Sequence, residues 1–111
     1  MLNAFHIKTL EIPGWEADDI IGTLAEKFGN LKDIEVEIFS SDNDILQLVK
    51  DPKVYVRLIK KGLKEAELFH EQEVKNKFGI MPEQLPDYKG LIGDTSDNIP
   101  GMAGVGPKTA L

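Results

Sequence analysis

One stretch near the carboxyl end, residues 93–110, constrains this chain more than any other part. Its first half carries two carboxylates three positions apart, Asp94 and Asp97. Its second half is rich in glycine and runs into Pro107, whose fixed φ suits the first position of a helix. Glycines let a backbone approach a ligand closely, and free N–H groups at a helix start favour a phosphate. A cation at one end and a phosphate at the other would suit an enzyme that cuts phosphodiesters.

The acidic residues that matter most form three groups, each after an apolar segment. These groups are Glu16-x-Asp18-Asp19, Asp42-x-Asp44 and Asp94-x-x-Asp97. Like charges gathered in one site repel one another unless cations lie among them. Carboxylates without His or Cys suit hard ions such as Mg²⁺ or Mn²⁺. Two such ions can activate water and stabilise both reacting oxygens of a phosphodiester, so we expect the groups to converge in space.

Each group also has a simpler explanation. Acids in the first turn of a helix interact favourably with its dipole, which would account for Glu16 and its neighbours. Asp42 would serve as an N-cap, although that explains one aspartate of its pair and not the other. No second His or Cys is spaced to make a ligand of His6 or His70, so we expect a strand-surface residue and a helix cap.

Composition limits the class of protein. A chain of 111 residues forms at most one domain, and without cysteine it has no disulfide or thiolate chemistry. No long apolar run and no basic-apolar leader is present, which predicts a soluble intracellular protein with no membrane partner. The net charge of −6 resides in the three acidic groups, and without them the remainder is close to neutral. Divalent metal ions bound at these groups would neutralise their negative charge, and the rest of the chain would then not repel nucleic acid.

Positive charge is concentrated between residues 50 and 64. The basic residues there are Lys50, Lys53, Arg57, Lys60, Lys61 and Lys64, against the single acid Asp51. The run is either the solvated surface of a hairpin or a stripe that follows phosphates. The sequence leaves both interpretations open.

The hydrophobic pattern predicts an α/β fold. We expect strands over 4–12, 34–39, 54–58 and 63–69, and helices over 17–28, 45–49, 70–78 and 82–92. Turns are expected at 13–14 and 60–62, with helix stops at 29–30 and 79. The pattern changes near residue 70, which divides the chain into an α/β part, 1–69, and a helical part with a hairpin, 70–111. Asp42 and Asp44 then follow a strand's carboxyl end, where α/β sheets build ligand sites.

Three segments together resemble a known family. Gly14–Asp19, Ser41–Leu48 and Gly93–Gly101 resemble motifs of the 5′-nuclease superfamily, in the family's order and spacing, and most of all the 5′→3′ exonuclease domain of bacterial DNA polymerase I. The resemblance implies a PIN-like core followed by a helix-hairpin-helix variant. It also implies two-metal, structure-selective hydrolysis of 5′ flaps, nicked DNA and RNA primers in replication and repair, in the bacterial cytoplasm.

The resemblance also implies roles for individual residues. Glu16 and Asp18 resemble ligands of a first Mg²⁺ or Mn²⁺ ion, Asp42, Asp44 and Asp97 resemble those of a second, and Asp19 and Asp94 support them. The residues that resemble the duplex-binding hairpin are Gly104, Gly106, Lys108 and Thr109. In relatives that hairpin often holds K⁺ through backbone carbonyls.

The family pattern includes a first strand with an aspartate, a further aspartate and a helical arch before the first matching residue. We therefore expect a partial core, truncated at both ends, with a sheet edge free to self-associate. We also expect little or no nuclease activity in isolation. A polymerase domain in the parent chain is compatible with the resemblance. The alternative functions are a non-catalytic duplex-DNA-binding module and, more remotely, a PIN-like ribonuclease.

Overall fold

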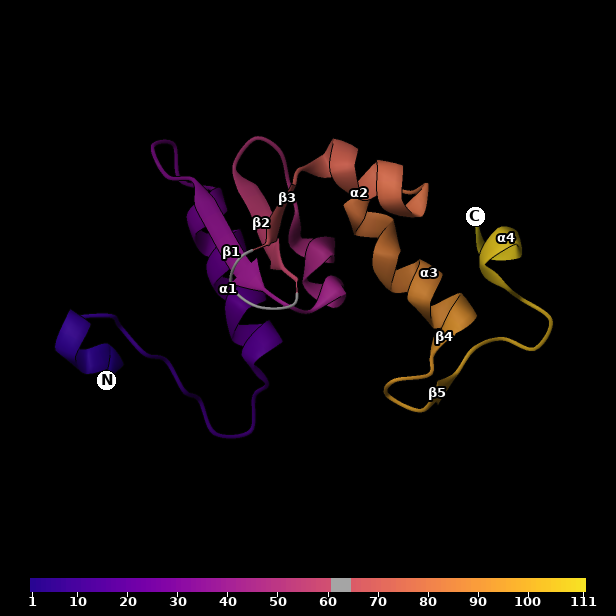
Figure 1. The fold of residues 1–111 in the computed structure, drawn as a ribbon, viewed down its shortest axis with the longest axis horizontal. Helices are drawn as coiled ribbons and strands as arrows, with labels where there is room; N and C mark the ends of the chain where they lie inside the picture. Colours follow the sequence, from indigo (N-terminus) through magenta and orange to yellow (C-terminus); the bar gives the residue numbers. More distant parts are fainter. Residues whose placement is uncertain (61–64) are drawn as a thin grey trace.

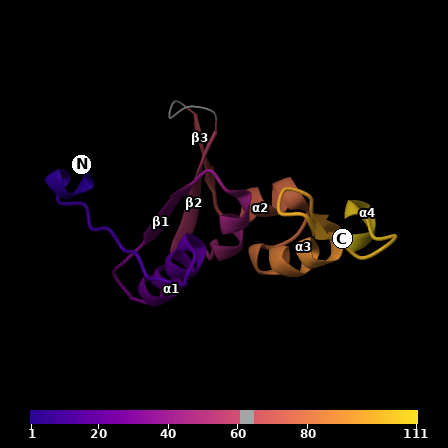
Figure 2. The same ribbon diagram turned by 90° about the horizontal axis from the view of Figure 1, so that it is seen from below.

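The computed structural model describes residues 1–60 and 65–111. The molecule is elongated, with principal extents of 51 × 30 × 29 Å. A sheet with its helices lies toward the amino-terminal side, and a run of shorter helices and loops extends away from it toward the carboxyl end (Figure 1). The amino-terminal arm stands apart from this body in both views (Figures 1 and 2).

The sheet in the described residues has three strands in the order β1-β2-β3. These are β1 (Val36–Ser40), β2 (Val54–Ile59) and β3 (Ala66–Phe69). β1 runs parallel to β2, with Val36 opposite Val54, and β3 runs antiparallel to β2. Alternate β2 residues are buried, as expected for a strand that packs one face against helices. β1 is an edge strand, and self-association at this edge stays a prediction.

Helix ends occur where the sequence supplies capping groups. α1 spans Ala17–Gly29, and the Asp19 carboxylate accepts a hydrogen bond of 3.3 Å from the Glu16 amide at its start. α2 spans Glu71–Phe78 and ends at Gly79, whose φ of 79° suits glycine. His70 is the N-cap residue of α2, as expected, and its amide donates to a Glu73 carboxylate oxygen at 2.9 Å. Its Nδ1 lies 2.9 Å from an Asp51 carboxylate oxygen.

The remaining elements are short. They are the 3₁₀ turns η1 (Leu2–Phe5), η2 (Asn43–Leu48) and η3 (Pro82–Gln84), the helices α3 (Leu85–Ile92) and α4 (Pro107–Ala110), and the two-residue strands β4 (Gly93–Asp94) and β5 (Ile99–Pro100). The expected helices at 45–49 and 82–92 are thus confirmed, the first as a 3₁₀ turn. The predicted Pro107 helix start is confirmed as well.

A single hydrophobic core joins the sheet to the helices on both sides of residue 70. Its members are Ala25, Ile38, Ile45, Leu46, Val49, Val54, Val56, Leu58, Phe69, Val74, Ile80 and Leu85. Because α3 begins at the buried Leu85 and also contacts η2, this core fixes α3 against the end of β1. The residues that directly follow α3, which begin with β4, therefore lie near η2.

The predicted strand over residues 4–12 is wrong. The segment contains the end of η1, no regular structure from residue 7 onward, and exposed side chains throughout. Its alternation was only partial, and a strand needs a partner to satisfy its backbone groups, which the described residues do not provide for this segment.

In the part of the basic run that the structure describes, two residues pair with neighbouring acids. Arg57 Nε lies 2.7 Å from a Glu37 carboxylate oxygen, and Lys60 Nζ lies 2.6 Å from Glu67. These pairs favour a solvated sheet surface over a stripe for phosphates. Lys61 and Lys64 lie outside the described residues, as do part of the predicted turn at 60–62 and the first two residues of the strand over 63–69. In the ranges 1–60 and 65–111, no helix is long and apolar enough to cross a bilayer.

Candidate metal centre

Three carboxylates converge although they are distant in sequence. Asp44, Asp94 and Asp97 each offer an oxygen within 4.8 Å of the others. Asp44 lies in η2, Asp94 in β4, and Asp97 in the turn between β4 and β5. The packing of α3 against η2 brings these segments together.

The connection after β1 presents Asp44 to this cluster. The Asp42 carboxylate accepts a hydrogen bond of 2.9 Å from the Asp44 amide and caps η2, while Ser40 Oγ accepts one of 3.0 Å from the Asp42 amide. Capping therefore accounts for Asp42 but leaves the Asp44 carboxylate free to face the cluster. Both residues follow the carboxyl end of a parallel strand, the usual place for ligand sites in α/β sheets.

A closed loop carries the other two carboxylates. β4 and β5 pair at its base, where Gly93 lies opposite Pro100 beside Gly101. A Cβ added to Gly93 would lie 2.3 Å from the Gly101 nitrogen, so the two backbones are in direct contact. Inside the loop the Asp94 carboxylate accepts hydrogen bonds from the Ser96 amide, at 2.9 Å, and from the Ser96 hydroxyl. These bonds fix the orientation of Asp94.

Lys89 places a positive charge between two of the carboxylates. Its ammonium donates to Asp44 Oδ1 and, at 3.1 Å, to Asp94 Oδ2. Partial burial lowers the pKa of Lys89, but these hydrogen bonds outweigh burial and leave the pKa above its usual value. Sequence reasoning missed Lys89, because its place beside the acids depends on the packing of α3 and on no local motif.

The pKa of the Asp94 carboxyl lies well below its usual range, because of hydrogen bonds from the Ser96 hydroxyl, Lys89 and the Ser96 amide. A carboxyl whose pKa is lower in the folded chain than in the unfolded chain stabilises the fold, and this stabilisation is complete when the pH is above the ordinary pKa of 3.8. That contribution is lost as the pH falls toward the lower folded pKa. At neutral pH the centre therefore holds fully ionised groups of both signs.

The donor set fits a hard divalent cation. Mg²⁺ binds oxygens at about 2.1 Å in an octahedron, so opposite ligands lie about 4.2 Å apart. The three carboxylate oxygens lie within 4.8 Å of one another, a spacing compatible with ligands of one such ion. The Lys89 ammonium occupies the space beside Asp44 and Asp94 and would move as an ion enters.

The acids at the start of α1 face the same region. The pKa of Asp18 is raised by partial burial and by the negative charges of Asp42, Asp44 and Asp19. Asp18 therefore lies within electrostatic reach of the second acidic group. That the first two groups share one metal-binding cleft stays a prediction. Glu16 is exposed at the α1 N-cap and, within 1–60 and 65–111, is not part of the three-carboxylate cluster.

We expect Asp18→Asn to stabilise the metal-free chain at neutral pH. A carboxyl with a raised folded pKa destabilises the fold while it is ionised, and this cost disappears as the pH falls below the ordinary value of 3.8. Thermal melts in EDTA should show a small rise in Tm at pH 7 and none at pH 3. Asp33→Asn, in an exposed loop, is the matched control. A lower Tm for Asp18→Asn at pH 7 would contradict the repulsion.

The glycine-rich hairpin lies after β5, away from the three-stranded sheet (Figure 1). Gly104 has a φ of 81°, which suits glycine, and the Val105 amide donates to the Met102 carbonyl at 3.0 Å. Gly106 is the N-cap of α4 with a φ of −103°, an extended backbone conformation that any residue adopts. Nothing lies within 4 Å of a Cβ built on either glycine.

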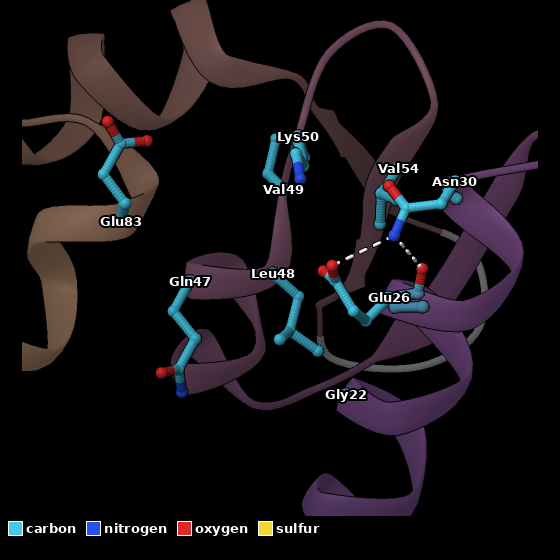
Figure 3. Close-up of a pocket in the computed structure, with 11 residues that line it drawn as sticks. Gly22, Glu26, Asn30, Gln47, Leu48, Val49, Lys50, Val54 and Glu83 are labelled. Atoms are coloured by element: carbon cyan, nitrogen blue, oxygen red, sulfur yellow. Dashed lines mark hydrogen bonds between the residues drawn. The ribbon is translucent and has the colours of Figure 1, made fainter.

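A groove on the opposite side of η2 is separate from this centre. It has a volume of about 260 Å³ and lies between α1, η2 and η3 (Figure 3). Asn30 Nδ2 donates to the Glu26 carboxylate within it, at 3.0 Å. None of the acids of the three groups lines it, so the groove takes no part in the chemistry of the carboxylates.

Two family models match the chain from end to end. Residues 1–79 match the 5′-3′ exonuclease N-terminal resolvase-like domain, and residues 80–111 match the 5′-3′ exonuclease C-terminal SAM fold. Over its whole length the chain is 49% identical to DNA polymerase I of Bacillus subtilis and 47% identical to a 5′-3′ exonuclease of Aquifex aeolicus. It spans 12% and 36% of those proteins.

A solved structure shares the fold. A variant of T5 5′-exonuclease matches with a TM-score of 0.82 and 29% identity, over 98% of this chain and 42% of the exonuclease chain. The expected α/β fold with a helical carboxyl-terminal part is confirmed by this match and by the family models.

Proposed function

Because the chain belongs to the 5′-3′ exonuclease family, we propose that it forms the metal-binding and part of the DNA-binding surface of a 5′→3′ nuclease that hydrolyses DNA phosphodiesters. The observation that carries this proposal is the convergence of Asp44, Asp94 and Asp97 within 4.8 Å. The proposed substrates are duplexes with a 5′ flap, a nick or an RNA primer, which arise in bacterial replication and repair. The parent chain of such a nuclease either contains a polymerase domain or lacks one.

We assign two groups of ligands. Glu16 and Asp18 would hold one Mg²⁺ or Mn²⁺ ion, and Asp42, Asp44 and Asp97 would hold the other, with Asp19 and Asp94 in support. The convergence of Asp44, Asp94 and Asp97 supports the second group. An ion bound there lowers the pKa of its water and stabilises charge on phosphate oxygens. Ser96 holds the Asp94 carboxylate in place, and Lys89 orients Asp44 and Asp94 toward each other.

The carboxyl-terminal hairpin is proposed to hold duplex phosphates through Gly104, Gly106, Lys108 and Thr109, with K⁺ bound by its carbonyls. We propose that residues 1–69 carry the first two acidic groups and residues 70–111 the third with the DNA-binding elements. The single hydrophobic core contains residues from both parts and would hold them in a fixed relative position.

We expect Gly106→Val to weaken duplex binding more than Lys108→Ala. The valine would obstruct the approach of a phosphate to the α4 start, whereas the alanine removes one charge screened by salt. Because no atom lies within 4 Å of a Cβ at Gly106, the variant should fold normally. Fluorescence anisotropy on two unrelated duplexes across a salt series measures both effects. Each phosphate contact contributes about −0.9 to the slope of the logarithm of the binding constant against the logarithm of the salt concentration, and we expect two or three contacts. Equal affinities for wild type and Gly106→Val would exclude the hairpin as anchor.

The proposed activity is tested with a labelled 5′-flap duplex in Mg²⁺, in Mn²⁺ and in EDTA, using the chain and its Asp97→Asn variant. Metal-dependent product that the variant loses supports a nuclease. Metal-dependent binding without product favours the non-catalytic DNA-binding module, which the hairpin observation supports. Product from an RNA strand of the same shape, and not from DNA, would favour a ribonuclease.

A further inference from the structure

Lys89 holds a position in which its ammonium can serve two partners in turn. The ammonium donates to Asp44 Oδ1 and, at 3.1 Å, to Asp94 Oδ2, so α3 contributes a cation to carboxylates of η2 and β4. The Lys89 side chain is still 31% exposed. A lysine side chain has a flexible four-carbon stem. The ammonium can therefore leave the two carboxylates and meet a group from solvent without any change in the backbone.

The surroundings of Lys89 limit the directions in which its ammonium can move. A small recess of about 20 Å³ lies beside the centre, with room for about one water molecule. Phe78, Leu85 and Pro86 give this recess an apolar wall, and Asn43 and Asp44 lie on its polar side. A charged ammonium does not turn toward an apolar wall, because it would lose its hydration there. Its accessible positions are the carboxylates and the solvent in front of them.

The balance of charge changes when a divalent ion binds. The three carboxylates of the cluster and the one ammonium leave an excess of two negative charges, which one divalent ion neutralises. Without the ion, a phosphate meets this negative excess, and Lys89 is already engaged with Asp44 and Asp94. With the ion bound to those oxygens, the ammonium has lost its acceptors and lies beside a neutral centre. A phosphate at the ion is then the nearest anionic acceptor for Lys89.

We propose that Lys89 is a phosphate ligand that the metal releases: Asp44 and Asp94 hold its ammonium in the metal-free chain, and a divalent ion at these carboxylates frees it to donate to a phosphate of the bound DNA. This inference rests on the proposed function and adds a contact to it. Lys89 thereby couples the loading of the centre to the capture of DNA. Because such coupling is reciprocal, DNA strengthens metal binding by the same factor.

The test compares the salt dependence of DNA binding for wild type, Lys89→Met and Lys89→Arg. Methionine keeps an unbranched stem and removes the charge. Fluorescence anisotropy on a duplex with a 5′ overhang is measured in Ca²⁺, which takes the same oxygen ligands as Mg²⁺, and in EDTA. Each phosphate contact contributes about −0.9 to the slope of log affinity against log salt. In Ca²⁺ we expect the wild-type slope to be steeper than that of Lys89→Met by about 0.9, and in EDTA we expect equal slopes. Lys89→Arg should match wild type.

Lys75→Met is the matched control, because Lys75 is exposed on α2 and lies outside the carboxylate cluster. Its slopes should equal those of wild type in both conditions. In addition, Lys89→Met should bind Mn²⁺ at least as tightly as wild type by electron paramagnetic resonance, since it lacks the competing ammonium. Should Lys89→Met fail to fold, the ¹⁵N NMR signal of the Lys89 ammonium in wild type decides, because it must shift on adding Ca²⁺ and again on adding DNA.

Three results would overturn the proposal while leaving DNA binding intact. Equal slopes of wild type and Lys89→Met in Ca²⁺ would show that Lys89 contacts no phosphate. The same difference in slope in EDTA as in Ca²⁺ would show a contact that needs no metal. A tenfold loss of Mn²⁺ affinity in Lys89→Met would show that Lys89 only maintains the shape of the site. Failure of wild type to bind the duplex in Ca²⁺ would remove the proposed function as well.

Discussion

Gly93→Ala is expected to open the loop of residues 93–101 and abolish the three-carboxylate cluster. The new Cβ would lie 2.3 Å from the Gly101 nitrogen and 2.6 Å from the Ile99 oxygen, at a φ of 78°. The positive φ alone costs about 1–3 kcal/mol, and a clash with backbone atoms adds to it. A total above about 3 kcal/mol lowers the closed-to-open equilibrium constant of the loop more than about 100-fold.

The core contains no residue of this loop, so the damage should be local. We expect the global Tm to change little, amide protection to be lost across 93–101 in hydrogen exchange, and Mn²⁺ affinity measured by electron paramagnetic resonance to fall at least tenfold.

Two other glycines provide controls for Gly93→Ala. Gly104 has a φ of 81° but nothing within 4 Å of a Cβ, so Gly104→Ala carries the backbone strain without the clash. Gly90 lies inside α3 with open space around it, and Gly90→Ala should stabilise the helix by about 1 kcal/mol. Both controls should keep Mn²⁺ affinity near wild type. Protection of the loop amides in Gly93→Ala would show that the Gly93–Gly101 contact is not what closes the loop.

Asp44→Asn should have the second large effect, on metal affinity. The substitution removes one of the three converging carboxylates and keeps the shape of the side chain. Loss of even an outer partner of a metal site commonly costs 10- to about 100-fold in affinity, so loss of a direct ligand should cost at least about tenfold. Mn²⁺ titrations followed by electron paramagnetic resonance measure it, and the rise in Tm on adding Mg²⁺ should shrink in parallel.

Asp87→Asn is the matched control, because Asp87 is an exposed acid in α3, outside the carboxylate cluster. It should leave Mn²⁺ affinity unchanged. In EDTA the stability of Asp44→Asn should be close to wild type, since the variant loses both the Lys89 pair and the repulsion among the acids. Unaltered Mn²⁺ affinity in Asp44→Asn would place the metal elsewhere.

The sequence predicted most of the elements because their ends carry local chemistry. α1 follows from its apolar periodicity and stops at Gly29, and α2 is bounded by His70 and Gly79. Asp44, Asp94 and Asp97 were predicted as site residues because carboxylates grouped without His or Cys suit a hard cation. The structure brings their oxygens within 4.8 Å of one another, and their role as ligands stays a prediction. These inferences depend on short-range patterns or on residue chemistry.

What the sequence could not predict depends on packing between distant segments. Residues 4–12 alternate weakly, and only the structure shows that no described strand pairs with them. Lys89 reaches the acids through the contact of α3 with η2, and Gly93 meets Gly101 across the loop.

The lysine between the carboxylates makes metal uptake an exchange of cations rather than the filling of a bare anionic site. Without metal, Lys89 already neutralises part of the charge of Asp44 and Asp94, so the centre does not need an ion to keep its shape. A divalent ion would compete with the Lys89 ammonium for the oxygens of Asp44 and Asp94, and this ammonium stays attached to the chain. In the proposed centre, uptake or release of a metal ion would therefore be coupled to a short movement of the Lys89 side chain.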